Sequence, residues 1–292
     1  MCDDLAFDDM IGHNLRQGGL SRRELGSLAL GTGLAFALPR VANAAETTES
    51  EVEVKTPDGT ADAYFVHPAN GTGAGVLIWP DIFGLRPAFR KMATRLAESG
   101  YSVLVVNPFY RTKKAPVAAE GASFQDPTVR AALMQLAGTL NKDTAESDAK
   151  TFIAWLDKQS SVDKKRKMGT MGYCMGGPLT MRTAATIADR VGAGASFHGG
   201  GLVTDKPESP HLLVPKMKAS YLFAIAANDD EKQPDAKNVL RETFAKAKLP
   251  AEIEVYEGAM HGWCPPDSQV YNEAQAEKAW SRLLALFEKA LA

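Results

Sequence analysis

The sequence predicts an α/β fold in which a mostly parallel sheet is covered by helices on both faces. Uninterrupted apolar runs, such as residues 75–80 and 101–108, are typical of strands buried on both sides. Segments with helical spacing of apolar residues alternate with these runs, as parallel pairing requires. The chain has 292 residues, 45% of them hydrophobic, and this is enough to bury one large core.

Residues 1–45 have the layout of an export leader. Arg22 and Arg23 precede a weakly apolar stretch, residues 25–38, and a small-residue cleavage motif follows at 42–44. The paired arginines resemble a bacterial twin-arginine signal, so we expect the twin-arginine export machinery as a partner and the periplasm as the destination. The stretch is shorter than the roughly 20 residues of a membrane-spanning helix, and we expect no stable membrane insertion. The alternative is a basic amphipathic helix of the mature fold.

The mature domain, residues 46–292, opens with two alternating segments that predict a β-hairpin at a sheet edge, at 51–56 and 61–68. Further strands are expected at residues 75–80, 101–108, 167–172, 191–199, 219–229 and 251–258, and helices at 87–99, 126–141, 144–158, 175–188, 235–247 and 271–291. The chain shows no internal repeat and no second core, so we expect a single domain. We also expect a monomer.

Composition narrows the range of functions. A net charge of -2 argues against nucleic acid as a partner, because phosphate binding needs a basic face. Three cysteines are too few for a disulfide scaffold, and the five histidines form no metal-binding pattern. We therefore expect no metal.

The segment Gly-Tyr-Cys-Met-Gly at 172–176 is the most informative motif. Glycines destabilise strands and helices, so their density here suggests a turn that bulkier residues cannot make. A strand that reverses at once into a helix is a nucleophile elbow, and it would expose Cys174 at the sheet edge and at a helix N-terminus, which favours a thiolate. The N–H of Met175 would then face a developing oxyanion. The alternative is a structural cysteine beside a glycine-rich helix start.

Two further residues follow in the order that an elbow nucleophile requires. Asp229 and His261 each come directly after a predicted strand, where ligands bind in parallel sheets. We expect Cys174 to attack, His261 to transfer the proton and Asp229 to orient the imidazole. Asp230 is the competing acid, and Asp229 is preferred because it comes first after the apolar run.

With these residues assigned, the chain resembles the dienelactone hydrolase family of the α/β-hydrolase fold. The resemblance covers most of the mature chain and is carried by "GYCMGG", "PDIFGL", "NPFYR", "AAND" and "MHGW". It implies an α/β-hydrolase fold and hydrolysis of small esters or lactones, typically enol-lactones, through an acyl-cysteine. It implies no cofactor.

The resemblance also implies roles for residues around the site. Ile82 would give the second oxyanion N–H, and Asp81 stands where the family often has a glutamate that contacts the resting thiol. Arg111 matches an arginine that holds a substrate carboxylate in the family. The alternative is that Arg111 is a surface arginine. For Asp81, the alternative is a turn residue without a role in the site. Trp263 is expected to be either an apolar wall of the site or part of the core. The family's further arginine after the histidine is absent here, which makes dienelactone itself less secure as the substrate.

Three points stay open on the residues alone. The enzyme is either a lactone hydrolase or a general carboxylesterase or thioesterase on the same fold. A non-catalytic exported redox or binding protein would instead use Cys174 and Cys264, for example as a disulfide; otherwise Cys264 is a plain thiol. His198 either lines the pocket or is a structural histidine, and the second is favoured.

Overall fold

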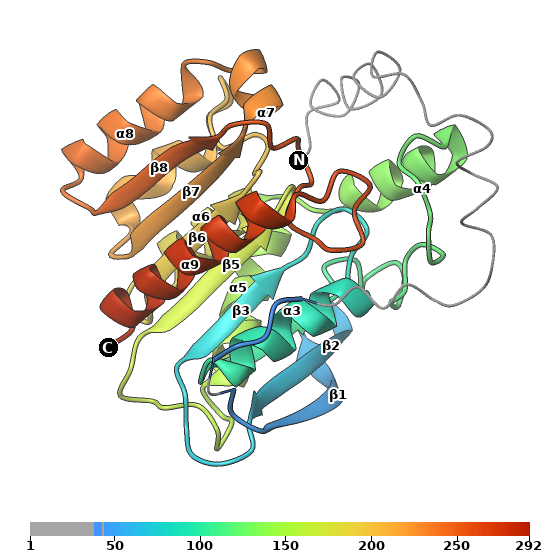
Figure 1. Cartoon of the computed structure of the whole chain (residues 1–292), viewed down its shortest axis with the longest axis vertical. Helices are drawn as coiled ribbons and strands as arrows, with labels where there is room; N and C mark the ends of the chain where they lie inside the picture. The colour runs from blue at the N-terminus through green and yellow to red at the C-terminus, as the bar shows by residue number, and fades with distance from the viewer. Residues whose placement is uncertain (1–37, 43) are drawn as a thin grey trace.

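The computed structural model describes residues 38–42 and 44–292, and it is built around one eight-stranded sheet (Figure 1). The strands are β1 (Thr47–Thr56), β2 (Gly59–Pro68), β3 (Gly75–Trp79), β4 (Ser102–Val106), β5 (Met168–Tyr173), β6 (Val191–Phe197), β7 (Ser220–Ala226) and β8 (Ala251–Tyr256), and they lie in the order β1-β2-β4-β3-β5-β6-β7-β8. Pairing is parallel from β4 to β8 and antiparallel for the hairpin β1–β2 and its junction with β4. The predicted fold class is confirmed.

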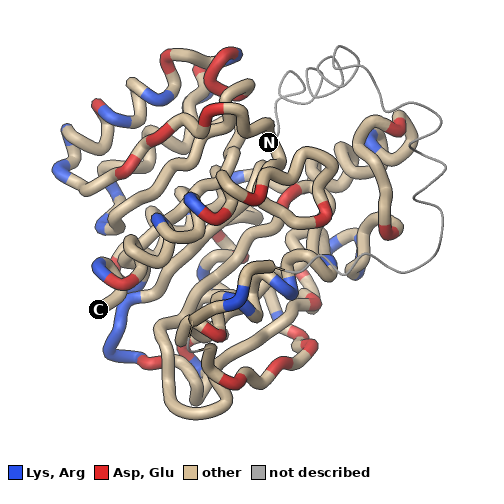
Figure 2. The backbone as a smooth tube through the Cα atoms, viewed as in Figure 1, with Lys and Arg blue, Asp and Glu red and all other residues tan. Residues whose placement is uncertain are grey.

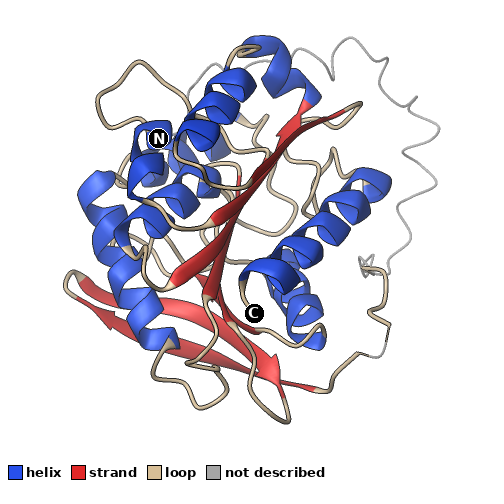
Figure 3. Ribbon diagram, turned by 90° about the vertical axis from the view of Figure 1, so that its left-hand side faces the viewer, coloured by secondary structure: helices blue, strands red, loops and turns tan. Residues whose placement is uncertain are grey.

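Helices cover both faces of the sheet, as Figure 3 shows edge-on. They are α3 (Pro87–Glu98), α4 (Pro127–Ala137), α5 (Lys142–Leu156), α6 (Gly176–Thr186), α7 (Ala227–Lys232), α8 (Ala236–Lys246) and α9 (Glu273–Ala290), with a 3₁₀ segment η1 (Pro210–Lys216). Alternate residues of each strand point to opposite layers, so Val76 and Ile78 pack with α3 and α9, while Leu77 and Trp79 pack with α5 and α6. The continuous apolar runs seen in the sequence follow from this two-sided burial.

The predicted elements are found within a few residues of their expected bounds, with two additions. The strand expected at 219–229 ends at Ala226, and the next six residues form the short helix α7. The 3₁₀ segment η1 was not anticipated. The proposed leader falls largely outside the described residues, and within the described chain every helix is too short or too polar to span a membrane.

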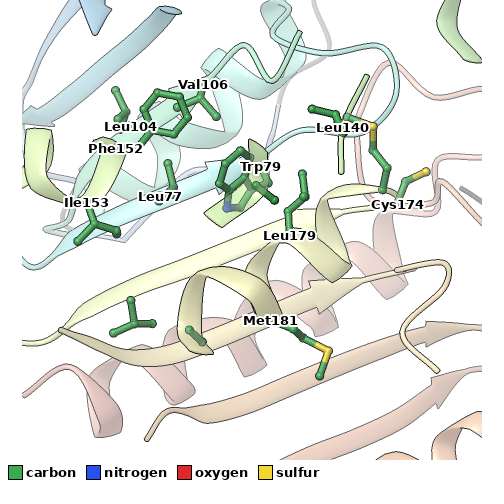
Figure 4. Close-up of a cluster of buried hydrophobic side chains, with 14 of the residues drawn as sticks. Leu77, Trp79, Leu104, Val106, Leu140, Phe152, Ile153, Cys174, Leu179 and Met181 are labelled. Carbon is green, nitrogen blue, oxygen red and sulfur yellow. The ribbon is translucent and has the colours of Figure 1, made fainter. Parts of the chain in front are cut away.

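One of the two core layers ends at the carboxyl edge of the central strands. Figure 4 shows Leu77, Trp79 and Phe152 in this layer, with Cys174 at the far end of the cluster. Trp79 packs edge-on against Phe152 with ring centroids 5.8 Å apart. The rigid centre of the sheet therefore supports the turn that holds Cys174.

Candidate active site

The turn between β5 and α6 is built by close backbone contacts. A Cβ at Gly172 would lie 2.2 Å from the carbonyl oxygen of Gly176, and a Cβ at Gly176 would lie 2.3 Å from that of Trp79. Only glycine fits at both places. The dense glycines of the motif are thus explained by steric demand.

Cys174 occupies the strained position of this turn. Its φ of 53° lies in the left-handed region, which non-glycine residues rarely adopt. Its N–H donates to the carbonyl of Phe197 at 3.1 Å, and its own carbonyl accepts from the N–H of Gly177 at 3.0 Å, so both backbone groups are held. The side chain precedes α6, whose positive dipole end stabilises negative charge.

His261 and Asp229 meet at the ends of neighbouring strands. Nδ1 of His261 lies 2.7 Å from Oδ2 of Asp229, and the His261 N–H donates to the side chain of Asn228 at 2.8 Å. Asp230 points elsewhere, because both of its carboxylate oxygens accept from Nζ of Lys237 at 2.6 Å. Of the two candidate acids, Asp229 is therefore the one that contacts the imidazole.

Cys174 and His261 both line a cavity of about 600 Å³. Its remaining walls come from the loop after β3, the first turns of α3, the segment 116–125 and the segment 262–270. The cavity lies at the carboxyl end of the parallel strands, where α/β sheets bind ligands. It is large enough for a small organic substrate.

Of the two expected oxyanion donors, Ile82 is a cavity-lining residue and Met175 is not. Ile82 lies in the loop after β3, and Met175 follows Cys174 as the N-cap of α6. Both side chains are buried, with 2% of each exposed. Among the hydrogen bonds of residues 38–42 and 44–292, neither amide N–H acts as a donor.

Sequence reasoning missed an ion-pair cluster at the cavity wall. Arg86 donates from Nη1 and Nη2 to Asp81, at 2.6 and 2.9 Å, and from Nε and Nη2 to Asp267, at 2.7 and 3.0 Å. Oδ1 of Asp81 also accepts from the N–H of Phe83 at 2.9 Å. Asp81 thus holds the loop that carries Ile82 and also binds Arg86. The sequence had suggested a contact with the Cys174 thiol and gave no indication of these two contacts.

The structure does not support the predicted role of Arg111. Its guanidinium donates to both oxygens of the buried Asp148, at 2.7 and 2.8 Å, and to Asp58. It also stacks over the ring of Tyr110 and lies outside the set of cavity-lining residues. Arg111 is a structural residue that joins α5 to the β1–β2 turn, and its placement corrects the expected carboxylate contact.

The aromatic residues behind the histidine form core. Trp263 is completely buried, stacks on Tyr256 with centroids 4.8 Å apart and is not a cavity-lining residue, so it lies in the core. His198 does line the cavity, and its ring lies edge-on to His261 at 5.1 Å between centroids. Burial and the nearby His261 lower the pKa of His198 well below its usual range.

The second mature cysteine is separate from the cavity. Cys264 is buried and is not part of a disulfide, and burial raises the pKa of the Cys264 thiol well above its usual value. It does not line the cavity that contains Cys174. The structure thus shows no disulfide between these two residues.

The profile of the dienelactone hydrolase family matches residues 61–291. The chain belongs to the dienelactone hydrolase family. A "Carboxymethylenebutenolidase" from Rhodococcus opacus is 28% identical over 244 residues, covering 81% of this chain and 90% of the relative.

Solved structures share the fold of this family. A dienelactone hydrolase from Anabaena variabilis superposes with a TM-score of 0.60 at 18% identity, covering 84% of this chain and 99% of its own. A dienelactone hydrolase-like promiscuous phosphotriesterase from metagenomic libraries gives a TM-score of 0.69 at 20% identity, with the same coverage. At these identities the structural likeness shows the fold, and the profile match shows the family and, with it, a hydrolase.

Proposed function

We propose that the protein hydrolyses small esters or lactones through an acyl-cysteine intermediate on Cys174. The observation that carries this proposal is the convergence of three features on one cavity: an elbow cysteine at positive φ, a histidine, and a carboxylate on Nδ1 of that histidine. Membership of the dienelactone hydrolase family supports it.

The tautomer of His261 follows from its partner. An ionised carboxylate only accepts hydrogen bonds, so Nδ1 of His261 carries the hydrogen and Nε2 is left as the base. Nε2 takes the proton of the Cys174 thiol, and the dipole of α6 stabilises the resulting thiolate. Asp229 orients the ring and stabilises the imidazolium.

The reaction then proceeds in two steps, acylation of Cys174 and hydrolysis of the acyl-enzyme. The thiolate attacks the carbonyl carbon and a C–S bond forms, while the amides of Ile82 and Met175 stabilise the oxyanion. The C–O bond breaks, and His261 gives its proton to the leaving alkoxide or enolate. Water, deprotonated by His261, attacks the thioester; the acid leaves and the thiol regains its proton.

Replacement of the nucleophile tests this proposal. Cys174→Ala should abolish hydrolysis of p-nitrophenyl acetate while circular dichroism and the thermal midpoint stay close to the wild type. Cys264→Ala is the matched control, and it should keep activity because this thiol lies outside the cavity. Unchanged turnover in Cys174→Ala would remove the acyl-cysteine mechanism.

The same experiment separates the competing functions. A redox or binding protein would show no turnover in the wild type and a titratable change of its two buried thiols on oxidation. A general carboxylesterase or thioesterase would turn over neutral esters or thioesters as fast as lactones, and a substrate panel compares them.

We also propose that the protein is exported through the twin-arginine route, because residues 21–44 carry the paired arginines, the apolar stretch and the small-residue motif. N-terminal sequencing of the protein recovered from the periplasm should give a start near Ala45. An Arg22→Lys, Arg23→Lys double variant should stay in the cytoplasm. Release of that variant at the wild-type level would contradict this route.

A further inference from the structure

Arg86 is the one arginine among the described residues that line the cavity, and its guanidinium is already paired with two carboxylates of the protein. Each nitrogen of its guanidinium donates to a carboxylate of Asp81 or Asp267. Burial opposes its charge, but the two carboxylates raise its pKa above the usual range. A substrate carboxylate would have to displace one of these internal ones to reach it.

The other charges of the cavity wall do not favour an anion. Three carboxylates, those of Asp81, Glu120 and Asp267, line the cavity against two cations, Arg86 and Lys91. Lys91 and Glu120 are both exposed, where water and salt screen their charges, and the sheltered group of Arg86, Asp81 and Asp267 is net negative. Figure 2 shows acidic and basic residues interspersed along the backbone. A negatively charged acyl group would therefore enter a site whose walls are net negative.

Apolar side chains form much of the remaining wall, beside the polar residues Ser123, Gln125, Ser268 and Gln269. Phe83 comes from the loop after β3, and Pro116, Ala118, Ala122 and Phe124 come from the segment that covers the site. The rings of Phe83 and Phe124 lie edge to face, 6.4 Å apart, and Arg86 lies over Phe83 at 5.5 Å. Such apolar groups favour an alkyl or aryl acyl group over a charged one.

We propose that this site selects uncharged esters or lactones with an apolar acyl group and discriminates against substrates that carry a free carboxylate. The inference rests on the proposed ester hydrolysis. It deepens that function by naming the substrate class, and it differs from the carboxylate-bearing substrate expected from Arg111.

The test compares two esters of equal acyl length. The p-nitrophenyl esters of butyric acid and of succinic acid both carry four-carbon acyl groups, and only the second ends in a carboxylate. Cys174→Ala measures the spontaneous hydrolysis to be subtracted. We expect kcat/KM for the butyrate to exceed that for the succinate by at least about tenfold at low salt.

Charge variants identify the cause of this preference. Asp267→Asn removes one carboxylate from Arg86, so it should raise kcat/KM for the succinate relative to the butyrate several-fold. Asp189→Asn is the matched control, since it removes the same charge from an exposed site outside the cavity, and it should leave the ratio unchanged. Because the readout is a ratio, partial loss of folded enzyme does not affect it.

The outcomes are distinct. Equal or faster turnover of the succinate overturns the selectivity, and so does an Asp267→Asn ratio equal to that of the wild type. A fall of the succinate rate in Lys91→Gln, with the butyrate rate unchanged, would show that Lys91 holds a carboxylate and would also overturn it. If the wild-type protein hydrolyses neither ester, the proposed function itself is overturned.

Discussion

The carboxylate of Asp229 lies 2.7 Å from Nδ1 of His261, at the ends of two adjacent parallel strands. The neighbouring Asp230 instead binds Lys237, so two consecutive aspartates have different partners. The order of the residues along the chain suggested this choice, and the geometry gives its reason: α7 begins directly after β7 and directs its first-turn acids to different partners.

The two acids provide a matched pair of variants. Asp229→Asn should lower kcat about 10²–10⁴-fold, because the amide no longer selects the required tautomer of His261. Asp230→Asn breaks only the pair with Lys237 and should retain activity within about twofold. Steady-state kinetics on a p-nitrophenyl ester measures both, and equal losses in the two variants would contradict the assignment of Asp229.

The glycine packing at the elbow predicts a stability effect. Gly172→Ala would place a Cβ 2.2 Å from the Gly176 carbonyl oxygen, so the turn must shift. We expect a loss of about 3 kcal/mol or more in the free energy of unfolding, together with loss of activity.

The control is Gly200→Ala, because a Cβ at Gly200 meets no atom within 4 Å. It should change the free energy of unfolding by less than about 1 kcal/mol. Urea denaturation measures both variants, and similar stabilities for the two would show that the elbow tolerates a side chain.

The ion-pair cluster predicts a second stability effect. Arg86→Ala leaves Asp81 and Asp267 facing each other in a half-buried site, and we expect a cost of about 3 kcal/mol. Lys114→Ala breaks the exposed pair with Glu53 and should cost less than about 1 kcal/mol.

Activity adds an independent measure for Arg86. Since Arg86 joins the loop of Ile82 to the segment that follows His261, its removal should also lower kcat. A stable, fully active Arg86→Ala enzyme would show that the cluster holds neither loop.

His198 predicts a pH dependence of stability. Its folded-state pKa is depressed by burial, so below the ordinary value of 6.5 the unfolded chain binds a proton that the folded chain does not. The free energy of unfolding should therefore fall as the pH drops below 6.5, with His198 contributing at most about 1.4 kcal/mol per pH unit.

A variant isolates this contribution. Asparagine tolerates the positive φ of 40° at this position, so His198→Asn should keep the fold and remove the His198 part of the slope. Urea denaturation between pH 5 and pH 7 compares the two proteins. Identical slopes would mean that His198 titrates normally in the folded state.

Local pattern in the sequence predicted the residues that the structure brings together at the cavity, Cys174, His261 and the partner of His261, Asp229. Buried strands, the glycine-rich elbow and the order Cys174, Asp229, His261 are short-range signals, since each residue directly follows an apolar run. The ion pairs of Asp81 were harder to predict. Asp81 and Asp267 both bind Arg86, but they lie 186 positions apart along the chain.

The same limit explains the error at Arg111. Its partners Asp58 and Asp148 lie 53 and 37 positions away, so the motif around Arg111 gave no sign that its charge was already paired. For Arg86, the Arg-Pro step at a helix start and an aspartate five positions earlier were visible but unspecific. Long-range ion pairing, which decides which arginine faces a ligand, is set by the fold and has no local pattern.

The acyl-cysteine mechanism is tested most directly by mass spectrometry of the protein, quenched in acid while it hydrolyses a p-nitrophenyl ester. An acyl-cysteine mechanism predicts a population heavier by one acyl group, with peptide mapping placing that group on Cys174 and its decay matching product release. An unmodified protein under rapid turnover, or an acyl group on another residue, would contradict it.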